Sequence, residues 1–333
     1  MRHRLWEGEP PRPQRELLAR DVVRLVFYMP HDHPELASGV RHAIETYVRA
    51  VGEGPGTITL AFVDDDEGDE LTRERWNYIH HLLQFERKRR FFDEFSEDSA
   101  HQMEKRGYDT QLLFTGGRHS RNGYELRYRA RIPWRTPSPD AVSLLTATLP
   151  TEYLTAHGPA RIRELALEMA SQLRFVSGHV GLALRLYWPL RMADAAFRAE
   201  LLRYPGLDLR PAWLGEERMG TRLDGVHWLN FIAQPVLPQT GGGAALRSRL
   251  HAAGTVVREL DADRVLIELG EWPDAGDLTL GRTLPAYREL ARLLEPWLEP
   301  PRLSPDTTSD PPRYSSLRFT REEALRWWRR FLD

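Results

Sequence analysis

The segments LDGVHWLNFI at residues 223–232, RVLIELGEWPDAGD at 264–277 and LPAYRELARLLEPWL at 284–298 decide the fold class of this chain. The first two are rich in aromatic and branched apolar residues, which is typical of strands. The third opens with a proline and then repeats apolar residues at helical spacing. Residues 255–259 and 265–269 form a predicted hairpin with two aspartates in its turn. No catalytic motif lies in this stretch, which indicates a protein that works by holding a binding shape.

The same alternation of strands and helices continues on the N-terminal side of these segments. The segment 124–132 alternates apolar and charged residues, as an antiparallel strand with one solvated face does. The order strand, helix, strand over 21–63 favours a crossover unit, with a parallel pairing if the two strands are neighbours. Further strands are predicted at 21–28, 57–63, 110–114, 141–148 and 180–187, and helices at 34–50, 72–95, 159–174, 192–202, 244–252 and after the capping-box pattern at 320–323.

This order of elements predicts an α+β fold with a mixed, largely antiparallel sheet and flanking helices. We expect one continuous domain over residues 21–299 and leave open whether it consists of two similar lobes. A Pro-rich N-terminal arm at 1–20 precedes it, and a polar linker with a C-terminal helix at 300–333 follows it.

Composition narrows the class of function. The 333 residues include no cysteine, which excludes disulfides, thiolate metal sites and a cysteine nucleophile. The net charge of −2 disfavours direct binding to nucleic acid, because proteins that neutralise phosphates usually carry a basic excess. No apolar run is long enough to span a membrane, and no signal segment is visible, so we expect a cytoplasmic protein.

The sequence His31-Asp32-His33 is the nearest approach to a metal-ligand cluster. Two histidines two residues apart can share a metal with a distant carboxylate such as Asp64, and this pattern keeps a metal-dependent hydrolase open as an alternative function. The simpler interpretation is a polar loop between a strand and the helix that Pro34 begins.

The run from Asp64 to Glu70 is the most acidic segment. A calcium-binding loop has twelve residues, with glycine at the sixth position and glutamate at the twelfth. Counted from Asp64, these positions hold Asp69 and Arg75, so the segment does not match the pattern. It is either a solvated loop or an acidic patch that meets a basic groove on a partner. The residues that would contact such a partner are Asp64, Asp65, Asp66, Glu67, Asp69 and Glu70.

With these residues in view, the chain resembles the type VI secretion immunity family cognate to VRR-Nuc nuclease toxins, over roughly residues 20–300. The resemblance implies an antidote, encoded beside a secreted toxin, that binds the toxin and blocks its nuclease site. It implies neither a catalytic residue nor a cofactor. The motifs that carry it are Val23–Phe27, Ser177–Ala183, Tyr204–Leu209, Val226–Phe231, and Gly276-Asp277 before the helix that contains Tyr287.

Overall fold

In the computed structural model the chain divides into two compact units, each built from more than one segment. Unit 1 comprises Met1–Arg24, His179–Leu214 and Arg222–Asp333, and unit 2 comprises Leu25–Gly178 and Gly215–Thr221. Strand β2 (Glu16–Met29) contributes its first residues to unit 1 and its last to unit 2. The residues that the structure describes are 4–7, 16–63, 67–84, 101, 104–105, 107–117, 121–186, 195–210, 219–301 and 319–333.

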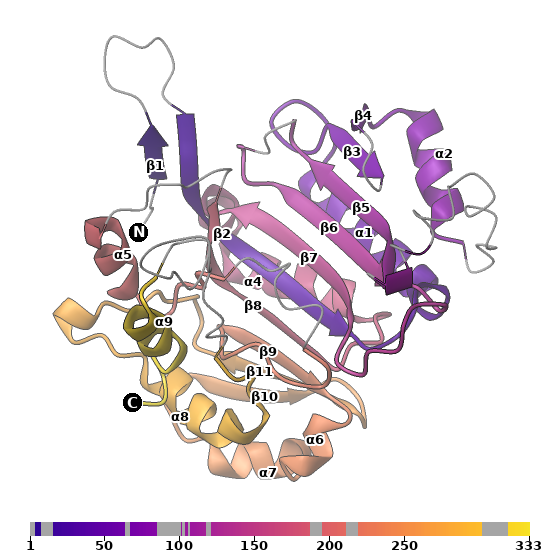
Figure 1. Ribbon diagram of the computed structural model, residues 1–333. Helices are drawn as coiled ribbons and strands as arrows, with labels where there is room; N and C mark the ends of the chain where they lie inside the picture. The colour runs from indigo at the N-terminus through magenta and orange to yellow at the C-terminus, as the bar shows by residue number, and fades with distance from the viewer. Residues whose placement is uncertain are drawn as a thin grey trace. The chain divides into compact units, whose positions relative to one another are not determined.

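Unit 2 is an α+β sheet covered by helices. Its strand order is β2-β7-β6-β5-β3-β4, and the pairs from β7 outward to β4 are antiparallel. Helices α1 and α4 contact each other, and α1 contacts β6 and β7 of the sheet (Figure 1). The remaining elements are β3 (Leu60–Val63), β4 (Asp69–Glu70), β5 (Tyr108–Thr115), β6 (Glu125–Arg131), β7 (Ser143–Pro150), α1 (His33–Val51), α2 (Arg73–Leu82) and α4 (Thr151–Ala170).

Unit 1 has the strand order β10-β11-β9-β8-β2, with β1 added antiparallel to β2. Helix α6 contacts β9, and α7 contacts the edge strand β10 (Figure 1). Its elements are β1 (Arg4–Glu7), β8 (Ser177–Leu186), β9 (Leu229–Ala233), β10 (Thr255–Glu259), β11 (Arg264–Leu269), α5 (Ala195–Leu202), α6 (Val236–Gln239), α7 (Gly242–Arg249), α8 (Pro285–Leu294), α9 (Arg321–Trp328), and the 3-10 turns η3 (Leu278–Leu280) and η4 (Glu295–Trp297).

The C-terminal helix α9 is part of the core of unit 1. Trp327 and Phe319 pack into one apolar cluster with Leu184, Leu201 and Tyr204. The predicted capping box is present, because Thr320 accepts the N–H of Glu323 at 3.1 Å while the Glu323 carboxylate accepts the N–H of Thr320 at 2.7 Å. This cap satisfies backbone donors at the helix start, and burial of Trp327 then holds the helix in place.

The predicted fold class is confirmed, and several predicted boundaries were wrong. Helix α2 ends at Leu82, and residues 85–95 of the predicted helix lie outside the described residues. Helix α4 begins at Thr151, because Gly158 adopts φ +75 and allows a kink before the helix continues. Strand β3 pairs with β5 and β4 and is not a neighbour of β2, so residues 21–63 do not form a parallel pair.

Candidate functional site: a buried polar cluster in unit 1

The two histidines proposed as metal ligands have separate structural roles. His31 Nδ1 lies 3.3 Å from the carboxylate of Glu35, one turn along α1. The buried ring of His33 bonds Tyr128 Oη at 3.1 Å through Nδ1 and the Leu82 carbonyl at 3.0 Å through Nε2. Both nitrogens of His33 therefore serve the packing of unit 2. Only residues 30–32 form the predicted loop, because α1 begins at the buried His33, one residue before Pro34.

The acidic segment lies partly outside the described residues, which do not include Asp64, Asp65 and Asp66. Glu67, Asp69 and Glu70 are exposed, and the last two form β4 at the edge of the unit 2 sheet. Asp69 pairs at 3.0 Å with the buried guanidinium of Arg75, which also donates to the Ala61 carbonyl at 2.8 Å. One end of the acidic segment is thereby fixed to α2 and β3.

A second polar cluster lies inside unit 1. His179, Asp208 and His227 are each less than 5% exposed, and they are the one group of three potential metal ligands found among the described residues. Sequence reasoning did not select them, because they are about 20 to 30 residues apart along the chain. A signal was nevertheless present, since three of the motifs that carry the family resemblance each supply one member: Ser177–Ala183, Tyr204–Leu209 and Val226–Phe231.

The two imidazole rings are stacked face to face. Their centroids are 3.6 Å apart and their planes differ by 9°. His227 Nε2 lies 2.7 Å from the backbone carbonyl of Asp224, so this nitrogen carries the proton and donates it. Gly181 on β8 makes room for the pair, because a Cβ there would lie 3.3 Å from the Cβ of His227.

Charged groups surround the stacked rings. Arg24 on β2 lies 3.4 Å from Asp208 and donates to the Leu184 carbonyl at 3.0 Å. Arg210 pairs with the carboxylate of Asp224 and lies 3.6 Å from Glu299. The carboxylates of Asp208, Asp224 and Glu299 are buried, and the nearby guanidinium groups compensate their charge.

Arg330, which follows α9 near the end of the chain, completes the cluster. Its guanidinium donates to the carbonyls of Pro205 at 2.8 Å and Trp327 at 3.0 Å, and it stacks on the Trp327 ring at 3.9 Å. Burial, together with the nearby charge of Arg210, lowers the pKa of Arg330 to about 9. Three guanidinium groups therefore face three carboxylates, those of Asp208, Asp224 and Glu299.

The stacking geometry does not fit a metal centre. A metal ion lies close to the plane of each imidazole that binds it, at about 2.0–2.1 Å from nitrogen for zinc. An ion between rings 3.6 Å apart would lie roughly 1.8 Å out of both planes. The neighbouring guanidinium groups of Arg24 and Arg210 would also repel a cation. In this arrangement the cluster is a network of structural contacts. Binding of a metal ion would require one of the two imidazole rings to rotate out of the stack.

Burial controls the protonation of both histidines. Loss of hydration lowers the pKa of His179 well below its usual value; a proton on His227 would lower it further, and the charge of Asp208 opposes this shift only in part. Burial also lowers the pKa of His227, against the opposing pull of Asp208 and Asp224. For Asp208, burial would raise the pKa, but Arg210 and Arg24 outweigh it and hold the carboxyl ionised. The stable state is therefore two neutral rings among paired charges.

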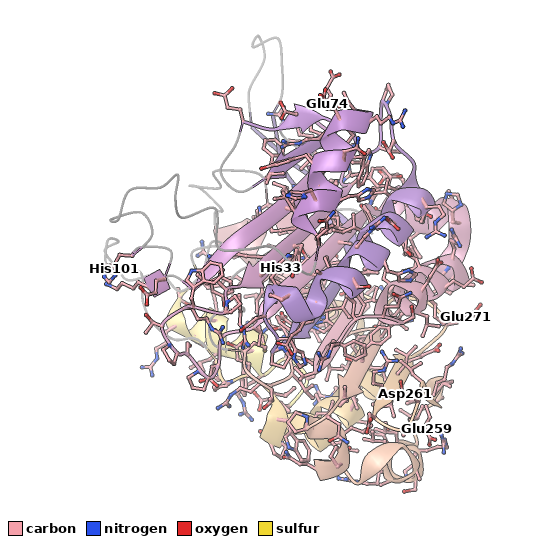
Figure 2. The ribbon with its side chains drawn as sticks, turned by 90° about the vertical axis from the view of Figure 1, so that its right-hand side faces the viewer. His33, Glu74, His101, Glu259, Asp261 and Glu271 are labelled. Carbon is pink, nitrogen blue, oxygen red and sulfur yellow. The ribbon has the colours of Figure 1, made fainter. Side chains whose placement is uncertain are left out.

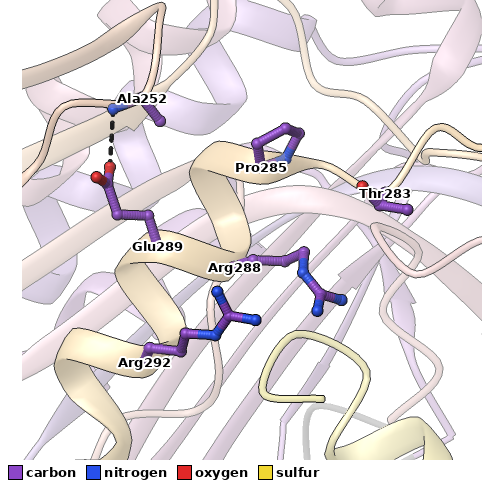
Figure 3. A pocket seen from close by; sticks show the side chains of 6 residues that line it. All are labelled: Ala252, Thr283, Pro285, Arg288, Glu289 and Arg292. Atoms are coloured by element: carbon purple, nitrogen blue, oxygen red, sulfur yellow. Dashed lines mark hydrogen bonds between the residues drawn. The ribbon is translucent and has the colours of Figure 1, made fainter.

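An open pocket of about 470 Å³ lies beside α8 in unit 1 (Figure 3). Two of the polar side chains that line it, Glu289 and Arg288, form hydrogen bonds within the fold. Glu289 accepts the backbone N–H groups of His251 at 3.0 Å and Ala252 at 2.8 Å, and Arg288 donates to the carbonyl of Asp333. The lining residues are Ala252, Thr283, Pro285, Arg288, Glu289 and Arg292.

Comparison with known proteins identifies the family. Residues 40–331 match the family model TsiV, described as type VI immunity for VRR-NUC. The chain therefore belongs to this family and is a type VI immunity protein. The match includes all three motifs that build the buried cluster, and α9 as well.

The solved structures give an independent result for the fold. The chain is similar to the Pseudomonas aeruginosa T6SS protein PA0821, with a TM-score of 0.70 and 19% identity, covering 95% of this chain and 85% of that one. No curated protein matches the chain. Among the described helices, none combines the length and apolar character needed to cross a membrane.

Proposed function

We propose that this immunity protein binds the nuclease domain of its cognate VRR-Nuc toxin and blocks the active or DNA-binding site, without catalysing a reaction. The family match over residues 40–331 is the observation that carries the proposal. The proposed cellular location of the protein follows from its target, because an inhibitor of a nuclease must bind the toxin in the compartment that contains the DNA. We therefore place the protein in the cytoplasm of the cell that it protects.

The proposed toxin-binding surface is the acidic segment of unit 2, from Asp64 to Glu70. Nucleases bind DNA through basic surfaces, and an acidic surface on the inhibitor competes for the same groups. Glu67 and Glu70 are exposed there, and Glu74 on α2 extends the negative charge next to them in sequence (Figure 2). Tyr78, 40% exposed on α2, adds the kind of aromatic side chain that anchors interfaces.

The structure suggests why this segment is suited to fast binding. The pair between Asp69 and the buried Arg75 fixes one end of the acidic segment before a partner arrives, which lowers the entropic cost of association. Exposed charges of one sign also raise the association rate, and salt screens this effect. The proposal therefore predicts a binding rate that falls as ionic strength rises.

The test of the function uses the intact chain and the toxin encoded beside it. We expect a 1:1 complex that abolishes DNA cleavage in vitro and protects cells that express the toxin. Cleavage that continues at a saturating concentration of the wild-type protein would contradict the proposed function.

The test of the surface compares Glu70→Lys with Glu271→Lys, a matched charge reversal at an exposed glutamate of unit 1. Surface plasmon resonance at low salt measures the association rate. We expect Glu70→Lys to reduce that rate about tenfold, and Glu67→Lys/Glu70→Lys to reduce it further, while Glu271→Lys changes it little. If the wild type binds but both single variants behave alike, the surface assignment is wrong and the function stands.

A further inference from the structure

We propose that the stacked pair His179–His227 is an acid-sensitive lock on unit 1: it holds the polar cluster and α9 together while both rings are neutral, and it opens that region when a ring takes up a proton. The proposal does not depend on which surface binds the toxin.

The first argument is geometric. Face-to-face stacking at 3.6 Å is compatible with two neutral rings, whereas a proton on each would place two positive charges at that distance inside the protein. The hydrogen bond from His227 Nε2 to the Asp224 carbonyl fixes one proton on the ring, so further protonation must occur at Nδ1. That nitrogen lies against β8, where a Cβ on Gly181 would be 3.4 Å from it.

The second argument is the balance of charge. Among the residues that the structure describes, six charged side chains from five segments lie around the pair, and with neutral rings their formal charges cancel. They are Arg24 of β2, Asp208 and Arg210 of the segment after α5, Asp224 of the loop before β9, Glu299 after η4, and Arg330 after α9. His179 lies 4.0 Å from both Asp208 and Asp224, but those carboxylates already face Arg24 and Arg210, so a proton on a buried ring leaves the cluster with an excess positive charge.

The third argument is connectivity. Arg330 reaches the cluster from the C-terminal end of α9, and its guanidinium stacks on the ring of Trp327. The guanidinium of Arg210 lies 5.4 Å from the centre of the same ring. Trp328 donates from its indole nitrogen to the Glu299 carbonyl at 2.8 Å. An excess positive charge in the cluster repels Arg210 and Arg330 together, so the contacts that hold α9 weaken first.

The sign of the pH dependence follows from the environment of the rings. Both folded-state pKa values lie below the ordinary value of about 6.5 that applies to the unfolded chain. Below pH 6.5 the unfolded chain therefore binds more protons, and stability falls as the pH falls. Stabilisation by ionised Asp208 is lost only in a lower window, below about pH 4, so the two effects are separable.

The decisive experiment measures hydrogen exchange by mass spectrometry between pH 7.5 and 5.0, with rates corrected for the intrinsic effect of pH. For the wild type we expect a selective loss of protection below pH 6.5 in peptides that cover 205–210, 222–231 and α9. The folded-to-unfolded ratio of this region should fall up to tenfold per histidine for each pH unit. Uniform loss across both units, or none above pH 5, would overturn the proposal.

Variants and a wild-type measurement complete the test. His179→Gln/His227→Gln removes both titrating rings and should flatten the profile between pH 6.5 and 5.0, whereas His251→Gln, at an exposed histidine of unit 1, should retain it. If the double variant does not fold, NMR of the wild type decides, since two of its twelve histidines should remain neutral at pH 6. Titration of all twelve near pH 6.5 in the folded protein would refute the lock.

Zinc addition tests the competing interpretation. We expect no change in thermal stability at pH 7.5, because the stacked rings cannot share an ion. Zinc stabilisation that disappears in His179→Gln would identify the cluster as a metal site and overturn the proposal.

Discussion

The substitution Gly39→Ala sets two physical effects of opposite sign against each other. Gly39 lies in the middle of α1, where alanine normally stabilises a helix by about 1 kcal/mol relative to glycine. In the structure, however, a Cβ at this position would lie 2.2 Å from the backbone carbonyl oxygen of Gln172, just after α4. That is roughly 1 Å closer than an ordinary contact between carbon and oxygen.

The packing effect should exceed the helix propensity. The atom in the way belongs to the backbone, so the clash is relieved only if α1 moves away from the end of α4. Overpacking of this kind costs about 1–3 kcal/mol, and here the whole helix contact must open, which places the cost at the upper end. After subtraction of the propensity gain, we expect Gly39→Ala to destabilise unit 2 by about 2 kcal/mol.

Urea unfolding followed by far-UV circular dichroism measures this difference. The control is Ser38→Ala, one residue earlier on the exposed side of α1, where the propensity gain acts without a clash and a slight stabilisation is expected. An unfolding midpoint for Gly39→Ala at or above that of Ser38→Ala would show that α1 and α4 do not approach as closely as described, and would refute the reasoning.

Two further predictions concern polar contacts. Asp32→Asn should destabilise unit 2 by roughly 2 kcal/mol in the same assay, because the Asp32 carboxylate accepts hydrogen bonds from Arg131 at 2.9 Å and Arg135 at 2.7 Å. The partial exposure of Asp32 moderates the cost of losing its charge. A destabilisation below about 0.5 kcal/mol would show that water takes over the role of the carboxylate. Thr320→Ala should cost about 1 kcal/mol, measured by hydrogen exchange in α9, whereas Thr320→Ser, which retains the hydroxyl bond to the Glu323 N–H, should cost little; equal effects would contradict the cap.

Much of the local structure was predictable from the sequence. The alternation in 124–132 predicted β6, the helical spacing after Pro34 predicted α1, and the pattern Thr320–Glu323 predicted the capped start of α9. These features depend on residues within one or two turns of each other, so neighbouring side chains and backbone groups determine them. The family resemblance likewise came from short motifs, and the match over 40–331 confirmed it.

Other features required the tertiary structure. The register of β3 against β5, which separates it from β2, depends on pairing between segments about 50 residues apart. Helix α4 extends before Pro159 because Gly158 absorbs a kink, and local spacing does not reveal that choice. The toxin-binding role of the acidic segment stays a prediction.

The sequence by itself determined the fold class, the capped start of α9 and the family, because these follow from local periodicity and from motifs that are contiguous in the chain. Only the tertiary structure decided which histidines meet. His31 and His33, two residues apart in the sequence, bond different partners, whereas His179 and His227 stack although 47 residues separate them. Contact between distant residues is set by how strands and helices pack, and burial in that packing then determines which side chains keep their protons.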